Sequence, residues 1–238
     1  AAQAGLRMLQ KGGNAIDAAL ASAIALTVVE PTMNGIGSDA FAIIWDGETL
    51  HGLNASGRSP SAWTPQHFSR YESMPTQGWD AVTVPGAVSA WVELSSRFGK
   101  LPFDALFEPA IDYARNGFLV TPIIHASWRN AEETFASFPE FGRAFLPGGH
   151  APGVGEKFTF ESQANSLQQI SESKGKSFYL GDLAEQIAAY SRASGGLMTA
   201  EDLANHQIEW VKPISVNYRG YTLHEIPPNG QGIAALIT

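Results

Sequence analysis

The sequence predicts a mixed α/β chain that combines antiparallel β-hairpins with amphipathic helices. Two pairs of short, largely apolar segments are joined by the turn dipeptides Asp46-Gly47 and Arg219-Gly220, which is a hairpin signal. Between the two hairpins, apolar residues recur every three or four positions, as they do in amphipathic helices. Strands and helices do not alternate one by one, so a parallel sheet built from βαβ units is not expected.

Composition and charge indicate a globular protein and exclude several other classes. The 238 residues fit one large domain or two small ones, at about 150 residues per domain. Hydrophobic residues make up 44% and charged residues 16%, which excludes disorder of the whole chain. The formal charge is −8 and no basic run exceeds two residues, so neither a nucleic acid nor an anionic membrane is expected as a partner. Without cysteine, the chain has no disulfide, no Cys-based metal site and no thiol nucleophile.

The longest apolar run and the two chain ends bear on whether the chain spans a membrane and in which compartment the protein lies. The run covers residues 18–29 and is interrupted only by Ser22 and Thr27. Because crossing a bilayer takes about 20 residues, we expect a buried helix here and no membrane span. The chain starts with Ala1 inside a helical pattern, and residues 233–238 resemble the first turns of an apolar helix. We therefore expect a chain truncated at both ends, and its localisation stays open.

The opening residues predict two helices that are broken at Gly12 and Gly13. Asn14 can cap the second helix together with Asp17, three residues further on. This helix is apolar nearly all round from residue 18 onward, so we expect it to be buried between layers.

The remaining elements follow from similar patterns. Residues 40–45 and 50–54 form the first expected hairpin, and residues 214–225 form the second. Thr199 and Asp202 give a second capping-box pattern. A short strand is expected over 82–84, and further helices are expected over 87–98, 103–116, 162–173 and 181–191, with residues 119–160 assigned only a helix followed by a long loop.

No local motif identifies a metal, phosphate or serine-nucleophile site. No two of the six histidines are three to five residues apart, so each is interpreted as a surface or strand residue and not as a metal ligand. A Gly-x-Ser-x-Gly elbow and a Walker loop are both absent. The glycine loop at 35–37 precedes a strand and not a helix, which favours a structural turn over a phosphate cradle. We expect four glycines to serve folding and loop shape: Gly12, Gly13, Gly35 and Gly37.

Arg58 is the candidate ligand-binding residue of the chain. It stands at the end of the second predicted strand among Ala, Ser, Gly and Pro residues, and no acid occurs between Glu48 and Glu72. An arginine in such surroundings needs an anionic partner, which either the fold or a ligand supplies. From the residues alone, a solvated or structurally paired arginine and a ligand-binding arginine both remain open.

Several segments, in their order along the chain, resemble the large subunit of the gamma-glutamyltransferase (gamma-glutamyl transpeptidase) superfamily. The resemblance covers nearly the whole chain outside residues 119–160. Around Arg58 the sequence NASGRSP is more similar to the cephalosporin-acylase and small amidohydrolase branch. The segments that carry the resemblance are GGNAIDAALASAIALTVVEP, NGIGSDAF, SGRSP, AVTVPGAVSAWVELSSRFGKLPF, EPAIDYARNGFLVT, FYLGDLAEQIA, SGGLMTAEDLANHQ and VNYRGYTLHEIPPNGQG.

This resemblance implies a fold and a reaction. The fold is α+β, the four-layer αββα sandwich of the N-terminal-nucleophile hydrolases, with residues 1–238 as an incomplete single large-subunit domain. The protein would be a proenzyme that cuts itself autocatalytically and exposes a Thr at the start of its small subunit. That Thr attacks an amide carbonyl with its own amine as the base, and water or an acceptor amine resolves the acyl-enzyme. No cofactor and no metal are implied.

The resemblance also implies a role for Arg58. This residue holds the place of the arginine that binds the substrate's carboxylate. Ser59 follows it where the transpeptidases proper usually carry a glutamate that helps to hold the substrate's amino group, so glutathione is not implied as the substrate. The Thr-Thr-His start of the small subunit is absent, and Thr238 does not fit the role because it ends an unfinished helix. No catalytic residue is therefore expected on this chain.

Two functions stay open at this point. The first is an amide hydrolase or acyltransferase that acts on a small-molecule amide bearing a carboxylate and is inactive without the cleaved C-terminal small subunit. The second is a catalytically silent homologue that serves as a binding module for acidic amides. The downstream sequence discriminates between them, because only the enzyme needs the processing Thr. A homo-oligomer is left open, and an unrelated two-domain sensor of acidic amides would make all the matched segments coincidental.

Overall fold

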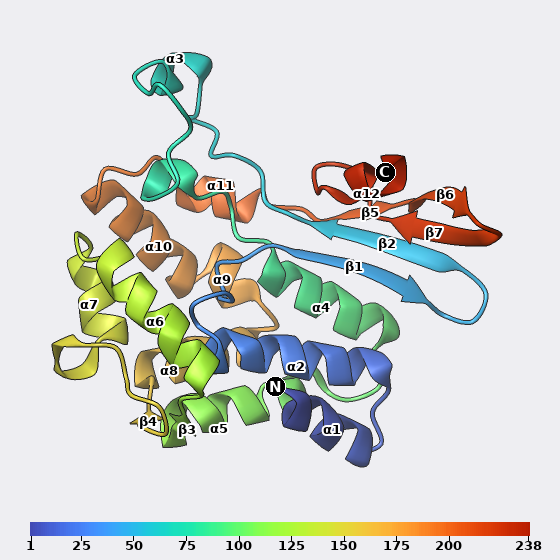
Figure 1. Ribbon diagram of the computed structural model, residues 1–238, viewed down its shortest axis with the longest axis horizontal. Coiled ribbons are helices and arrows are strands. Elements are labelled where there is room, and N and C mark those ends of the chain that lie inside the picture. Colours follow the sequence, from blue (N-terminus) through green and yellow to red (C-terminus); the bar gives the residue numbers. More distant parts are fainter. The chain divides into compact units, whose positions relative to one another are not determined.

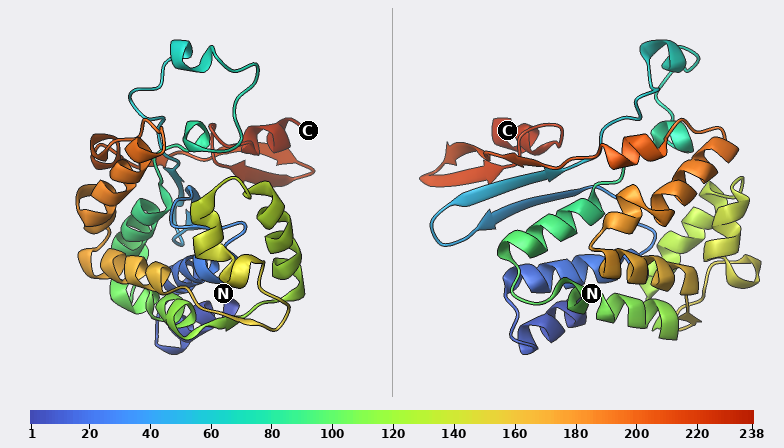
Figure 2. Two further views of the ribbon diagram at one scale, coloured as in Figure 1. Left: turned by 90° about the vertical axis from the view of Figure 1, so that its left-hand side faces the viewer. Right: turned by 180° about the vertical axis from the view of Figure 1, so that it is seen from behind.

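A computed structural model describes residues 1–238, drawn as a ribbon in Figure 1 and from two further sides in Figure 2. Contacts within the chain divide it into two compact units, and each is assembled from two separate stretches. The first unit comprises Ala1–Ile36 and Val92–Gly175, and the second comprises Gly37–Trp91 and Lys176–Thr238. No helix is both long enough and apolar enough to cross a bilayer.

The first unit is mainly helical, and its two short strands pair with each other. Helix α4 (Ala87–Phe98) contains the boundary between the second and the first unit. The other elements of the first unit are α1 (Ala2–Gln10), α2 (Ala15–Val29), η2 (Phe103–Leu106), α5 (Glu108–Asn116), β3 (Phe118–Leu119), α6 (Pro122–Thr134), α7 (Pro139–Phe145), η3 (Pro147–Gly149), β4 (Lys157–Phe158) and α8 (Glu161–Ser173).

The second unit carries the main sheet. Three antiparallel strands lie in the order β1-β2-β5, and a separate hairpin pairs β6 with β7. Its elements are β1 (Ala40–Trp45), β2 (Leu50–Ala55), α3 (Pro65–Phe68), η1 (Trp79–Ala81), α9 (Lys176–Leu180), α10 (Asp182–Ala193), α11 (Ala200–Ala204), β5 (Glu209–Val211), β6 (Ile214–Tyr218), β7 (Tyr221–Glu225) and α12 (Gly232–Ile237).

The start of α2 confirms the predicted capping box. The Asn14 side chain accepts hydrogen bonds from the backbone amides of Ile16 and Asp17, and Asp17 accepts one from the Asn14 amide at 2.8 Å. Asp17 is fully buried, and its carboxylate also accepts from the amides of Lys100 at 3.1 Å and Leu101 at 3.3 Å. One side chain thus starts α2 and anchors the loop after α4. The helix packs against α1, α5 and η2, as expected of a helix that is apolar nearly all round.

Both predicted hairpins are confirmed. The register of the first pairs Ala40 with Ala55 and Trp45 with Leu50, and Asp46 closes its turn by accepting from two backbone amides. The turn of the second places Arg219 and Gly220 at φ values of 52° and 88°, the left-handed pair that a two-residue hairpin turn requires.

Three expectations about secondary structure are wrong. Residues 82–84 form no strand, because the segment follows η1 and its amides reach single loop carbonyls, such as Val84 N–H to Arg58 O at 3.0 Å. The predicted helix over 103–116 is split into η2 and α5, because Pro109 is compatible only with the first turn of a helix. The stretch 119–160 is not a helix followed by a long loop: it holds the helices α6 and α7 as well as β4.

Aromatic packing explains the structure of that last stretch. The Trp128 ring lies 4.8 Å from Phe158 and 6.2 Å from Phe145, centroid to centroid, and Phe145 lies 5.1 Å from Phe160. Trp128 is buried and donates its indole N–H to the Phe145 carbonyl at 2.9 Å. These contacts give α6, α7 and β4 a small core of their own within the first unit.

Candidate substrate site around Arg58

The backbone around Arg58 is fixed by two chain segments that approach each other closely. Arg58 follows β2, and its carbonyl accepts the hydrogen bond from Val84. A Cβ atom on Gly57 would lie 1.4 Å from the Val84 carbonyl oxygen, and one on Gly86 would lie 1.7 Å from the Ala55 carbonyl oxygen. Only glycine permits this approach at either position. Because the two segments are pinned together, the loop presents Arg58 from a fixed backbone.

Arg58 lines an open cavity of about 470 Å³ in the second unit. Its side chain is 80% exposed, and the nearest acid is Glu209 at the start of β5, with 3.6 Å between Arg58 Nη2 and Glu209 Oε1. The fold therefore supplies one anionic partner itself, although the pair is loose and solvated. We call this space the Arg58 cavity, and its lining residues are Asn54, Ser56, Gly57, Arg58, Ser59, Gln207, Glu209, Pro228 and Asn229.

One wall of the Arg58 cavity is a closed ring of hydrogen bonds. Asn54 donates to Asn229 at 2.9 Å, Asn229 donates to Ser56 at 2.6 Å, and Ser56 donates back to Asn54 at 2.8 Å. Asn54 is on β2 and Asn229 lies on the loop after β7, so the ring ties this loop to the end of the strand that leads to Arg58. The side-chain amides are thereby held in one orientation.

A second, smaller cavity of about 260 Å³ shares Arg58 with the first and is also lined by His206. Ser89 Oγ donates to the Gly86 carbonyl at 2.6 Å and so accepts from His206 Nε2 at 2.9 Å. The His206 ring stacks on Tyr179, and burial lowers the pKa of His206, with Arg58 adding to this shift and Asp39 opposing it. Burial also raises the pKa of the Tyr179 hydroxyl to about 12. His206 thus ties the turn after α11 to the first turn of α4.

No pattern in the sequence groups these residues. The spacing of the histidines predicts an isolated surface or strand residue at His206, and no motif singles out Glu209. Glu209 meets Arg58 because β5 pairs with β2, with Asn54 opposite Glu209 in the register. That pairing joins residues far apart along the chain, and no local sequence pattern predicts it. Arg58 itself lies where the sequence placed it, directly after the second strand.

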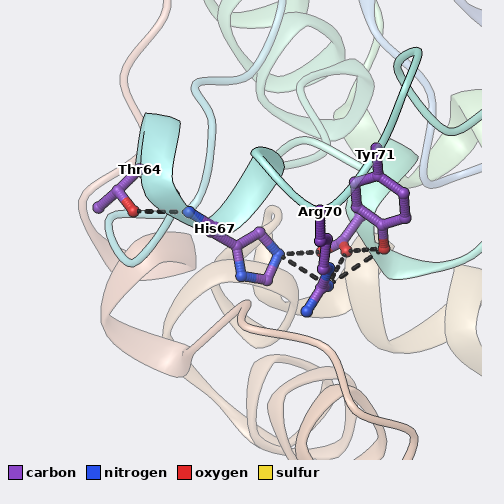
Figure 3. Close-up of polar contacts among 5 residues, drawn as sticks. Thr64, His67, Arg70 and Tyr71 are labelled. Atoms are coloured by element: carbon purple, nitrogen blue, oxygen red, sulfur yellow. Dashed lines mark hydrogen bonds and ion pairs between the residues drawn. The ribbon is translucent and has the colours of Figure 1, made fainter.

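A separate polar cluster, shown in Figure 3, lies in the long connection between β2 and α4. The buried Asp80 carboxylate accepts hydrogen bonds from His67 at 2.8 Å, Arg70 at 2.5 Å and Tyr71 at 2.6 Å. Burial alone would raise the pKa of Asp80, but the hydrogen bonds from Tyr71, His67 and Arg70 lower it to about 2. Both carboxylate oxygens already accept hydrogen bonds within the cluster, so we interpret the cluster as structural. No group of three or more His, Asp or Glu side chains is placed to hold a metal ion.

Comparison with known proteins places the chain in a family. The family model described as Gamma-glutamyltranspeptidase matches residues 1–238. Among curated relatives, the chain is 41% identical to "Glutathione hydrolase-like YwrD proenzyme" of Bacillus subtilis, with 100% of this chain and 46% of that protein covered. It is 36% identical to "Acylase ACY 1 proenzyme" of a Pseudomonas species, with 96% of this chain and 43% of that protein covered. The chain thus spans about half the length of the curated relatives it matches.

Solved structures agree with this result. The cephalosporin acylase from Bacillus halodurans matches with a TM-score of 0.94 and 49% identity, covering 98% of this chain and 45% of that one. The gamma-glutamyltranspeptidase from Helicobacter pylori matches with a TM-score of 0.93 and 31% identity, covering 99% of this chain and 69% of that one. The higher identity to the acylase agrees with the similarity of the Arg58 segment to the acylase branch. The chain belongs to the gamma-glutamyltranspeptidase family.

Proposed function

We propose that the whole protein is an amide hydrolase or acyltransferase, made as a proenzyme, in which Arg58 binds a carboxylate of the substrate. Family membership supports the reaction class, because the relatives carry names such as "Acylase ACY 1 proenzyme" and "Oxamate amidohydrolase proenzyme". The nucleophile is a Thr at the start of a small subunit cut from the same precursor, downstream of residue 238. Residues 1–238 then form part of the large subunit and contribute helices and sheet to a four-layer αββα sandwich.

The observation that carries the Arg58 assignment is an exposed guanidinium in a polar cavity on a fixed backbone. Its ion pair with Glu209 is too long for a strong hydrogen bond, so its N–H donors stay accessible to a ligand. A guanidinium offers two parallel donors that match the two oxygens of a carboxylate. A charge-assisted contact of this kind contributes about 1.5–3 kcal/mol, which is roughly a 10- to 150-fold gain in affinity.

The chemistry assigned to the small subunit is acyl transfer. The Thr hydroxyl attacks the amide carbonyl while the α-amine of the same residue takes its proton and passes it to the leaving amine. The C–N bond breaks, and an ester joins the acyl group to the Thr. Water or an acceptor amine then attacks the ester and releases the acyl group. Arg58 takes no part in these bond changes, because its role is to hold the acyl group by its carboxylate.

Two measurements on the full-length protein test the proposal. A denaturing gel with intact mass is expected to show two pieces, with Thr as the first residue of the smaller one. In the processed protein, Arg58→Ala is expected to raise KM for amides that carry a carboxylate and to leave self-cleavage intact. A single uncut chain that binds acidic amides without turnover would instead identify a silent binding module. Unchanged kinetics of Arg58→Ala would refute the carboxylate assignment.

A further inference from the structure

We propose that Asn229 is a site of spontaneous deamidation, in which the peptide nitrogen of Gly230 attacks the Asn229 side chain and converts it to an aspartate or an isoaspartate. This modification does not depend on the proposed function. An asparagine followed by a glycine is open to the reaction, because glycine has no side chain to keep its nitrogen away from the carboxamide. The chain contains such a pair at residues 34–35, 116–117 and 229–230.

The reaction makes a clear demand on the glycine. Its peptide nitrogen must give up its proton to solvent and reach the carboxamide carbon of the preceding residue, so an N–H that is held in a backbone hydrogen bond is protected. The new C–N bond gives a tetrahedral adduct, which expels ammonia and leaves a cyclic succinimide. Solvent water then opens the succinimide at either carbonyl. The net change is the addition of a water molecule and the release of an ammonia molecule.

The pair at 116–117 is protected by the end of helix α5. Asn116 is the last residue of α5, and the Gly117 N–H donates to the Tyr113 carbonyl at 3.0 Å. The Asn116 side chain donates to the Asp112 carboxylate at 2.7 Å. The nitrogen that would have to attack is therefore held by the backbone of the helix.

The pair at 34–35 is held from the asparagine side. The Asn34 N–H donates to the Glu30 carbonyl at 3.0 Å, and its side chain donates to the Glu30 carboxylate at 2.8 Å. The adduct would place a negative charge beside this carboxylate, and two like charges repel each other. Gly35 is also engaged in a contact of its own. Both residues of this pair are thus restrained.

The pair at 229–230 has neither restraint. It lies on the loop between β7 and α12 (Figure 1), and Asn229 is exposed. The Gly230 N–H makes no hydrogen bond. A Cβ atom on Gly230 would meet nothing within 4 Å, so the space beside this residue is open. The Gly230 nitrogen is therefore free to approach the side chain of the residue before it.

The Asn229 side chain is hydrogen-bonded, but its partners do not oppose the reaction. Its oxygen accepts from Asn54 at 2.9 Å and its nitrogen donates to Ser56 at 2.6 Å, and both bonds are solvent-exposed. Water can replace such bonds at a net cost of about 1 kcal/mol each, so the carboxamide can turn towards Gly230. A donor at the oxygen also stabilises the negative charge of the adduct. Asn34 and Asn116 instead have a carboxylate as their partner.

Deamidation would change the Arg58 cavity in two ways. A carboxylate at position 229 cannot donate to Ser56, so the ring of hydrogen bonds opens. It also adds a second acid to a cavity that is lined by one cation, Arg58, and one acid, Glu209. If Arg58 binds the substrate as proposed above, the modified protein binds carboxylate-bearing amides less tightly. An exposed charge changes such an equilibrium by up to about fivefold.

Peptide mapping of the full-length protein tests the modification. The protein is incubated at mildly alkaline pH and digested, and the peptides are analysed by mass spectrometry and by labelling with an isoaspartate methyltransferase. We expect the peptide with residue 229 to show the mass of aspartate and to take up the label, while the peptides with Asn34 and Asn116 stay unmodified. An unmodified Asn229, or equal modification of all three asparagines, would overturn the inference.

Gly230→Ala is the matched control variant. It keeps every side chain of the ring and adds a methyl group beside the attacking nitrogen. The fold accommodates this group, because the added Cβ meets nothing within 4 Å and Gly230 has no positive φ. We expect most of the modified peptide to be lost after the same incubation. Modification at the wild-type rate would show that the Gly230 nitrogen is not the attacking group, and would also overturn the inference.

Asn229→Asp tests the effect on the cavity separately. In the processed protein we expect it to raise KM for carboxylate-bearing amides by up to about fivefold. An unchanged KM here, together with a raised KM in Arg58→Ala, would refute the effect on binding. An unchanged KM in both variants would refute the proposed function, whereas the peptide map decides on the deamidation by itself.

Discussion

Gly57→Ala tests whether the close approach of two chain segments positions Arg58. The added Cβ would lie 1.4 Å from the Val84 carbonyl oxygen and 2.4 Å from its carbon. Both are backbone atoms, so no side-chain rotation relieves the overlap. The segments must separate by roughly 2 Å to restore a carbon–oxygen contact near ~3.5 Å. That movement breaks the hydrogen bond from Val84 N–H to the Arg58 carbonyl, now 3.0 Å long.

The expected loss of stability follows from the overlap and from the broken hydrogen bond. Overpacking of a tight contact costs about 1–3 kcal/mol, and a lost backbone hydrogen bond costs about 1 kcal/mol more. A total of about 2–4 kcal/mol lowers the melting temperature by roughly 4–16 °C for a domain of this size. Because a displacement of about 1 Å at a positioned group can cost 10²-fold, we expect kcat/KM for carboxylate-bearing amides to fall by about 10- to 100-fold.

Thermal unfolding and steady-state kinetics of the full-length processed protein measure both effects. Gly37→Ala is the control, since an added Cβ there meets nothing within 4 Å and the residue has no positive φ. This corrects the expectation that Gly37 is needed for loop shape, whereas Gly12 has a φ of +86° and Gly13 has no room for a side chain. Wild-type stability and kinetics in Gly57→Ala would refute the positional argument, and so would an equal loss in Gly37→Ala.

Three further predictions concern other residues. Arg58→Lys is expected to lose much of the affinity lost in Arg58→Ala, because a point charge cannot replace the two parallel donors; equal KM values for Lys and Arg would contradict this. Asp17→Ala removes the capping box and the acceptor for the Lys100 and Leu101 amides, and we expect urea titration to show a loss of about 3–5 kcal/mol. The pKa of Asp80 is about 2 when folded and ~3.9 when unfolded, so its contribution is complete above pH ~4 and is lost as the pH falls towards 2. Asp80→Asn should remove that part of the acid dependence, and an unchanged pH profile of urea unfolding would show that the cluster is not coupled to folding.

Local signals account for what the sequence predicts well. The turn residues Asp46-Gly47 and Arg219-Gly220 impose their own geometry, so both hairpins lie within a residue of where they are expected. The box of Asn14 and Asp17 likewise depends on backbone groups within one turn of helix. The boundaries of α4, Ala87–Phe98, coincide with the prediction because apolar spacing and Gly99 define both the face and the end of the helix.

Tertiary contacts account for the helices and site residues that the sequence does not predict. Helix α7 depends on Phe145 packing against Trp128 and Phe160, and no periodicity within α7 reveals those partners. The short helix α9, which contains the buried Phe178, is absent from the prediction for the same reason, since α9 lies against α10 and α11. At the site, the residues next to Arg58 in the sequence are enough to single it out. Glu209 is brought near Arg58 by the pairing of β5 with β2, and His206 by the fold that lines the smaller cavity, and only the folded chain shows either.

The interleaving of the two units constrains how the protein is made. The first unit needs residues up to Gly175 and the second needs residues beyond Lys176, although each begins within the first forty residues. Asp17 finds its amide partners 83 and 84 residues later in the chain. When half of this chain has left the ribosome, neither unit is complete enough to fold. Proteolysis at a single bond cannot liberate either unit whole, and neither unit can finish folding before residue 175 has been synthesised.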